Sequence, residues 1–144
     1  WAAPPGGPAP GINLPRIHGG QGSLSASRAT GPVLVWFPST GTISNRTASG
    51  LAQAAARNGA TLLVIPVVGA DAGPAETLAD QFPDWIVLHD RDGSVTLSYA
   101  GEFFPGVSPR RNLFIVSTRG TLTWSGFWPG VPEATLASEL HSAR

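Results

Sequence analysis

Residues 33–45, VLVWFPSTGTISN, decide the fold that this sequence predicts. The run VLVWF is continuously apolar and is bounded by turn signals, a pattern typical of a strand buried on both faces. The proline that follows ends the strand, and Ser44 or Asn45 can cap a helix that begins behind it. Alanine and leucine then recur at helical spacing until Asn58-Gly59 supplies a stop signal. This stretch therefore predicts a buried strand that leads into an amphipathic helix.

Outward from this stretch, the sequence predicts alternating strands and helices. Further strands are expected at 12–17, 23–25, 61–68, 85–88, 112–117 and 121–124. Further helices are expected at 74–81 and 132–141, and 95–99 reads as a short helix or a strand. Because helical segments separate the central strands, we expect those strands to pair in parallel, with the last hairpin adding an antiparallel edge.

The domain organisation follows from length and from the first residues. A chain of 144 residues with one plausible core fits a single domain, at 12–144. Residues 1–11 begin WAAPPGGPAP, are rich in Pro and Gly, and lack periodicity, which predicts an extended tail or linker. This segment is either a disordered terminus or a tether between the domain and a lost N-terminal segment.

Charge and hydropathy exclude several classes of partner. Nine basic and nine acidic residues give a formal net charge of zero, so no long-range field favours nucleic acid or an anionic membrane. No stretch approaches about 18 unbroken apolar residues, so no transmembrane segment is predicted. Only 12% of the residues are charged, about half the usual share. This composition suggests that part of the surface is covered by a partner.

Cysteine, methionine and lysine are absent from the sequence. The missing cysteine excludes disulfides, thiolate metal sites and cysteine nucleophiles in this chain. A chain that starts at Trp1 has lost its initiator, through a removed signal peptide, an expression boundary or simple Met removal. We favour the signal peptide, and hence a bacterial periplasmic or extracellular location over a cytoplasmic one.

Four strings in order resemble the thioredoxin-like superfamily, in particular its peroxiredoxin and periplasmic thiol-reductase branches. The resemblance covers roughly residues 12–141. It is carried by INLPRIHGGQGSLSASRATGPVLVWF, by the loop after it, by FPDWIVLHDRDGSVTLSYA and by RRNLFIVSTRGTL. It implies a thioredoxin-like α/β fold, with a central mixed sheet flanked by helices and an extra N-terminal β-hairpin.

The active-site loop of that family can be aligned in two registers. Peroxiredoxins carry Pro-xxx-Thr/Ser-xx-Cys after this strand. Here Pro38 and Thr42 match, the peroxidatic cysteine falls on Asn45, and the family's active-site arginine falls on Arg111. The register of the dithiol reductases instead puts Gly41 and Ser44 at the two cysteines and Arg111 at the cis-proline position. We prefer the peroxiredoxin register, because three of its positions fit.

Either register supports the fold and removes the thiol chemistry. The nucleophile in these families is a thiolate, and neither an Asn amide nor a Ser or Thr hydroxyl can replace it. The resemblance leaves a remnant pocket in which a helix N-terminus faces a cation, an arrangement that suits a small anion or a peptide carboxylate. Its residues are Pro38, Thr42, Ser44, Asn45 and Arg111. The alternative is an ordinary helix cap, with Arg111 paired to a nearby carbonyl or acid.

No other catalytic or metal set stands out. His18, His89 and His141 lack metal-ligand spacing, and no Gly-x-Ser-x-Gly elbow occurs. The carboxylates of Asp90 and Asp92 lie in an Asp-x-Asp-Gly pattern, which usually forms a turn. We therefore expect no metal and no cofactor.

Aromatic residues gather in loops near the C-terminus. They are Phe103, Phe104, Trp124, Phe127 and Trp128, and they either cover the open end of the sheet or form a docking surface for a protein partner. We expect a non-catalytic, degenerate redoxin domain that serves as an accessory protein-binding subunit of a larger extracytoplasmic assembly, with association with a membrane complex left open. The alternatives are the small-anion or carboxylate binder and an enzyme of unrelated, non-thiol chemistry. The oligomeric state is left open.

Overall fold

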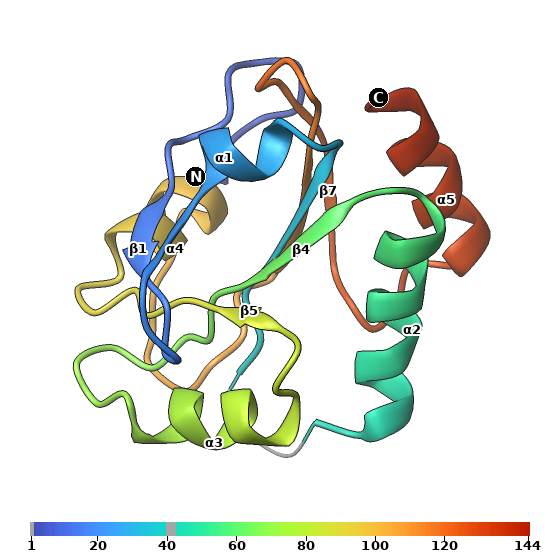
Figure 1. Ribbon diagram of the computed structural model, residues 1–144. Coiled ribbons are helices and arrows are strands. Elements are labelled where there is room, and N and C mark those ends of the chain that lie inside the picture. Colours follow the sequence, from blue (N-terminus) through green and yellow to red (C-terminus); the bar gives the residue numbers. More distant parts are fainter. Residues whose placement is uncertain (1, 40–42) are drawn as a thin grey trace.

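The computed structural model describes residues 2–39 and 43–144, with a mixed sheet between two layers of helices (Figure 1). Within these residues the main sheet has five strands in the order β5-β4-β3-β6-β7. Their bounds are β3 Val33–Trp36, β4 Thr61–Val64, β5 Ile86–Val87, β6 Leu113–Val116 and β7 Leu122–Gly126. Neighbours pair in parallel from β3 through β4 to β5, whereas β6 is antiparallel to both β3 and β7. The predicted α/β class is confirmed, and the last hairpin lies directly against the central strand.

Helices cover both faces of this sheet. In Figure 1, α2 and α5 lie on one side of the sheet and α1 and α4 on the other. Their bounds are α1 Leu24–Arg28, α2 Asn45–Arg57, α3 Gly73–Gln81, α4 Ser94–Ala100 and α5 Glu133–Ser142. The described residues contain no helix whose length and apolar character would let it cross a membrane.

The continuous apolar strands divide their side chains between two cores. Leu34 and Trp36 of β3 pack in the cluster that includes residues of α2, α3 and α5. Val33 and Val35 pack in the opposite cluster, which includes Tyr99 of α4. Successive side chains of a strand point to opposite faces, so a strand covered on both sides needs apolar residues at every position. The uninterrupted run VLVWF satisfies this requirement.

Helix α2 begins and ends where the sequence predicts. The Ser44 hydroxyl caps it by accepting a hydrogen bond from the Thr47 amide at 3.1 Å, and Asn58 ends it. Leu51 and three alanines form its buried face. The cap fixes the direction in which the helix leaves the carboxyl end of β3.

Two local predictions need correction, and a third, which left two alternatives open, is decided by the structure. Residues 23–25 were expected to form a strand, but β2 covers Gln21–Ser23 and the Ser23 hydroxyl caps the short helix α1 by accepting from Ala26. The segment 95–99, open between helix and strand, is helix α4. The strand expected at 61–68 ends at Val64, since Pro66 lacks a backbone N–H.

The N-terminal region lies against β5 at one edge of the sheet and against the start of β7 at the other. Strand β1, Asn13–Pro15, pairs with β2 as the predicted hairpin. At the end of β1, the His89 amide donates to the Pro15 carbonyl, and the Ile17 amide donates to the Val87 carbonyl. These two bonds place the chain after β1 along the edge of β5. The segment expected as a tail has no helix or strand, yet residues 2–10 are hydrogen bonded to Tyr99 of α4, to the turn before β7 and to Leu122 at the start of β7.

Candidate binding site

A cavity of about 290 Å³ lies where β3 ends and α2 begins. This is the carboxyl end of the parallel strands, where open α/β sheets usually bind ligands. The described residues that line it come from β3, the start of α2, the loop before β6 and the segment after β7. They are Trp36, Pro38, Ser39, Ile43, Ser44, Thr47, Ser108, Asn112, Phe127, Trp128 and Pro129.

The back of the cavity is built by Trp128, which is held at three points. The buried Asn112 side chain accepts from the Trp128 amide at 2.8 Å and donates to its carbonyl at 3.0 Å. The Trp128 indole N–H donates to the Thr47 carbonyl at 3.1 Å. A methyl group at Gly50 would lie 3.1 Å from the Trp128 ring, so glycine lets the indole lie close against α2. Trp128 therefore joins the end of the sheet to the first turns of α2.

A second loop fixes the opposite side of the cavity. The Ser39 amide donates to the Ser108 hydroxyl at 2.8 Å, which ties the segment after β3 to the loop before β6. Ser108 also borders a neighbouring hollow lined by Phe104, Val107 and Arg110. The cavity and this hollow therefore share one wall on the surface.

The described lining of the cavity contains no ionisable side chain. Its walls are mainly aromatic, proline and isoleucine side chains, with polar atoms from serine, threonine and asparagine. The buried indole N–H of Trp36 has no hydrogen-bond partner among the described residues. Such a lining suits an apolar group with a few hydrogen-bonding atoms.

Two of the predicted pocket residues do line this cavity, namely Pro38 and Ser44. The Ser44 hydroxyl is engaged, because it caps α2 and also donates to the Thr47 hydroxyl at 2.8 Å. Asn45 does not line the cavity; its side-chain oxygen accepts from Gln81 of α3 at 3.1 Å. Thr42, and Gly41 of the alternative register, lie outside the described residues.

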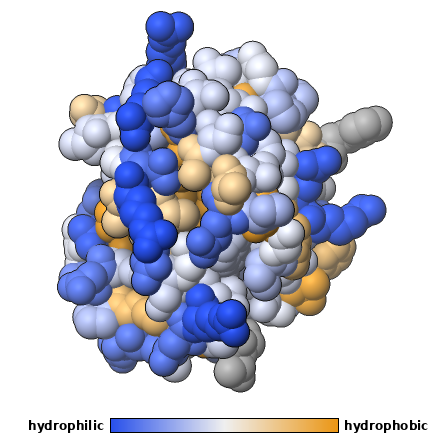
Figure 2. Space-filling view, turned by 90° about the vertical axis from the view of Figure 1, so that its right-hand side faces the viewer, coloured by the Kyte–Doolittle hydropathy of each residue, from blue (hydrophilic) through white to orange (hydrophobic). Residues whose placement is uncertain are grey.

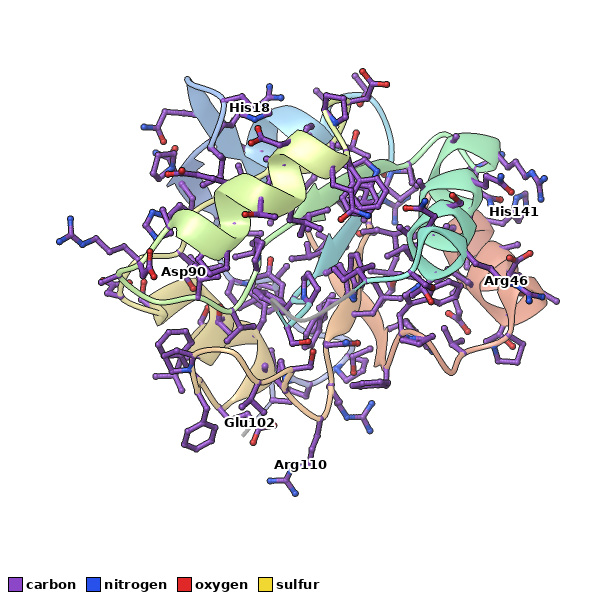
Figure 3. All side chains as sticks on the ribbon, turned by 90° about the horizontal axis from the view of Figure 1, so that it is seen from below. His18, Arg46, Asp90, Glu102, Arg110 and His141 are labelled. Atoms are coloured by element: carbon purple, nitrogen blue, oxygen red, sulfur yellow. The ribbon has the colours of Figure 1, made fainter. Side chains whose placement is uncertain are left out.

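The position of Arg111 is the largest difference from the predicted pocket. Its guanidinium donates to the Ser125 carbonyl at 3.0 Å and to the Ser125 hydroxyl at 3.2 Å. It lines a different hollow, with Glu102 and Arg110. In Figure 3, Glu102 and Arg110 project side by side, far from Arg46 on the first turn of α2.

Arg111 lies outside the cavity because side chains alternate along an extended segment. Consecutive residues of extended chain point to opposite sides, so Asn112 faces the cavity and Arg111 faces away. The sequence marked residue 112 only as the start of a strand. A polar residue at the start of an otherwise apolar strand is the one sequence signal that could have marked Asn112 as a site residue.

The five aromatic residues predicted as a docking surface separate into two groups. Trp128 is 6% exposed, and Phe103 and Trp124 pack against the two cores. For these three residues, the structure agrees with the alternative prediction, in which they cover the sheet core instead of forming a docking surface. Phe127 at the cavity rim is 43% exposed and Phe104 is 62% exposed.

Phe104 belongs to a rigid turn. The Val107 amide donates to the Phe104 carbonyl at 3.0 Å, and Gly106 has a φ of +83°, as a Pro-Gly turn requires. The Gly106 amide also donates to the Val67 carbonyl at 2.6 Å, which attaches the turn to the sheet. Val107 is 57% exposed beside Phe104, so the turn presents two apolar side chains to solvent.

Elsewhere the surface is mixed. Figure 2 faces the α2 and α5 side, where hydrophilic residues surround small apolar areas. The described residues hold no cluster of three or more histidine, aspartate or glutamate side chains able to bind a metal. The Asp90 carboxylate is buried and accepts from Thr96 and Val95 at the start of α4, so it forms the predicted turn.

Comparison with known proteins finds likeness in structure. No family model and no curated protein matches this sequence. Among solved structures, a candidate thiol:disulfide interchange protein DsbE from Chlorobium tepidum superposes with a TM-score of 0.74 and 21% identity, over 99% of each chain. The fold is thioredoxin-like.

Two further thioredoxin-like structures cover nearly all of the chain. The peroxidoxin BcpB from Mycobacterium tuberculosis gives a TM-score of 0.70 and 18% identity, over 97% of both chains. BsSco, of the Sco family of cytochrome c oxidase assembly proteins, gives 0.72 and 14%, over 99% of this chain and 97% of its own. The resemblance read from the sequence is thus confirmed at the level of fold. The sequence supplies no thiol to this thioredoxin-like chain.

Proposed function

We propose that this chain is a non-catalytic thioredoxin-like domain that binds a protein partner at the cavity beside α2. The observation that carries the proposal is the lining of that cavity, which combines aromatic and proline walls, scattered hydroxyls and no described ionisable group. The place where related folds carry a thiolate is thereby suited to holding an apolar side chain.

Two exposed aromatic residues extend this surface. Phe127 stands at the cavity rim, and Phe104 lies beyond Ser108 on the rigid turn. Exposed aromatic residues on preorganised backbone are frequent hot spots, because they bury a large area with little loss of conformational entropy. Arg110 beside them has a 93% exposed side chain that can engage the rim of an interface.

We place this role in an accessory subunit of an extracytoplasmic assembly. The low charged content and the likeness to a cytochrome c oxidase assembly protein of the Sco family support it. The anion-binding alternative loses its cation, since Arg111 is bound to Ser125 outside the cavity.

The first test is the mass of the native particle, extracted mildly from its source and measured by size-exclusion chromatography with mass detection. We expect a particle well above the 14.9 kDa of the chain that contains another protein. A monomer at that mass under mild extraction contradicts the accessory role.

The second test locates the surface. Phe127→Ser and Phe104→Ser should release the partner, whereas Leu97→Ser should retain it. Leu97 is a matched control, because it is an exposed apolar residue of α4, 53% exposed, and lines none of these hollows. Equal loss in all three variants, or in none, overturns the placement of the interface.

A further inference from the structure

The segment of residues 2–10 lies against residues 120–122, where the turn before β7 leads into the strand, and offers few side-chain contacts. It contains only alanine, proline and glycine. The hydrogen bonds that hold it are therefore from backbone to backbone, apart from one side-chain bond. Ala3 and Ala9 pack at the margin of the nearby core, and the remainder is half-buried or exposed.

The backbone bonds follow a regular spacing. The amides of Ala3, Gly6 and Ala9, three residues apart, donate to the carbonyls of Tyr99, Leu122 and Gly120, at 2.8, 2.7 and 2.9 Å. The prolines, at positions 4, 5, 8 and 10, occupy positions where no N–H is used. The sequence therefore places a donor wherever the domain presents an acceptor.

The domain side of this contact combines the start of β7 and the turn before it with Tyr99 of α4. Leu122 offers both of its backbone groups, since its amide also donates to the Gly7 carbonyl at 2.9 Å. The Tyr99 hydroxyl, which comes from α4, donates to the Pro10 carbonyl at 2.6 Å. The contact includes an antiparallel bridge between Pro8 and Thr121. An edge strand with a side-chain donor beside it has the form used for recognition by added strands.

We propose that the backbone of residues 120–122, at the start of β7, together with Tyr99, is a binding site for an extended Pro/Gly-rich segment, and that residues 2–10 fill it as an exchangeable ligand in cis. The hydrogen bonds are few, and residues 2–10 carry no side chain larger than proline to anchor them. The segment should therefore open far more often than the whole domain unfolds. This site is independent of the cavity beside α2.

The test starts from the intact chain, with a protease recognition sequence inserted after Gly11. This position is chosen because Gly11 is exposed and a side chain placed there would meet nothing within 4 Å. The folded protein is then cut, and a fluorescent peptide of residues 1–11 is titrated in while its anisotropy is recorded. We expect the labelled peptide to replace the cut segment and to bind saturably.

Two variant peptides distinguish specific recognition from non-specific binding. Ala9→Pro removes the N–H that reaches Gly120 and should weaken binding about tenfold. Pro4→Ala changes an exposed residue without a backbone bond in this contact and should bind like the parent. Equal binding by all three peptides, or retention of the cut segment until the whole domain unfolds, overturns the proposal.

Amide exchange in the unaltered protein gives a second readout. The Leu122 amide, which bonds only the segment, should exchange at least tenfold faster than the Ile65 amide, which bonds Trp36 inside the sheet at 2.8 Å. Equal protection of both amides shows that the segment is an integral part of the sheet, and the proposal fails.

Discussion

The side chain of Asn112 pairs with the backbone of Trp128 through two hydrogen bonds, in the manner of a neighbouring strand. Both partners are buried, Asn112 to 1% and Trp128 to 6% exposure. This pair positions the segment after β7 over the start of α2. The position of Trp128 at the back of the candidate binding site therefore depends on the side-chain amide of Asn112.

Replacing Asn112 by alanine should destabilise the protein by about 2–4 kcal/mol, because it leaves a buried N–H and a buried carbonyl without partners. The measurement is urea unfolding followed by tryptophan fluorescence. Asn45→Ala is the matched control, since Asn45 is exposed and bonds one side chain at the surface, and it should cost less than about 0.5 kcal/mol. Similar losses in both variants contradict this role for Asn112.

Gly50→Ala tests how firmly Trp128 is held against α2. Alanine in place of glycine inside a helix usually stabilises by up to about 1 kcal/mol. Here the new methyl group lies 3.1 Å from the indole ring, whose N–H bonds the Thr47 carbonyl and whose backbone is held by two hydrogen bonds to Asn112. We expect a net loss of about 1 kcal/mol and a changed tryptophan emission.

The exposed neighbour Ser49 provides the control for this prediction, because Ser49→Ala on the same helix should be neutral or slightly stabilising. A gain in stability at Gly50 shows that Trp128 can shift and that the wall of the cavity is adjustable.

The sequence predicts the layers of this fold better than its site, for physical reasons that particular residues illustrate. The run VLVWF must be apolar throughout when both faces are covered, so its pattern is unambiguous. The side on which Arg111 or Asn112 lies depends on a shift of one residue, which reverses every side chain and leaves no trace in composition. The burial of Trp128 depends on a partner 16 residues away and on a glycine in another helix. Helix α1 was not predicted, because its five residues after a serine cap are too few to show a helical repeat of apolar residues.

The carboxyl group of Asp92 should titrate below its ordinary value. The backbone N–H of Ser94 donates to it at 3.0 Å and the Ser94 hydroxyl adds a weaker contribution, and both lower its pKa from 3.8. A lowered folded-state pKa means that the stabilisation is present above pH 3.8 and is lost as the pH falls through the folded value. Carbon-13 NMR of the carboxyl group measures this midpoint. Ser94→Ala should raise the midpoint partway, because the backbone bond remains; an unchanged midpoint assigns the effect to the backbone alone.

Tyr99 provides a clean spectroscopic probe, since it is the single tyrosine and the sequence has no lysine. Its side chain lies in the core, its hydroxyl donates to Pro10, and burial raises its pKa above the ordinary value of 10.0. Absorbance at the tyrosinate band should therefore show no transition near pH 10 while the protein remains folded.

The sign of the coupling gives a second readout for Tyr99. Because the folded-state pKa is raised, the stabilisation is complete below pH 10 and is lost as the pH rises above it. The free energy of unfolding should therefore fall above pH 10 in the parent protein, and less steeply in Tyr99→Phe. At neutral pH, Tyr99→Phe keeps the ring in the core and removes one hydrogen bond, at a cost of about 1 kcal/mol. Tyrosinate formation at pH 10 with the fold intact contradicts the burial of this hydroxyl against residues 2–10.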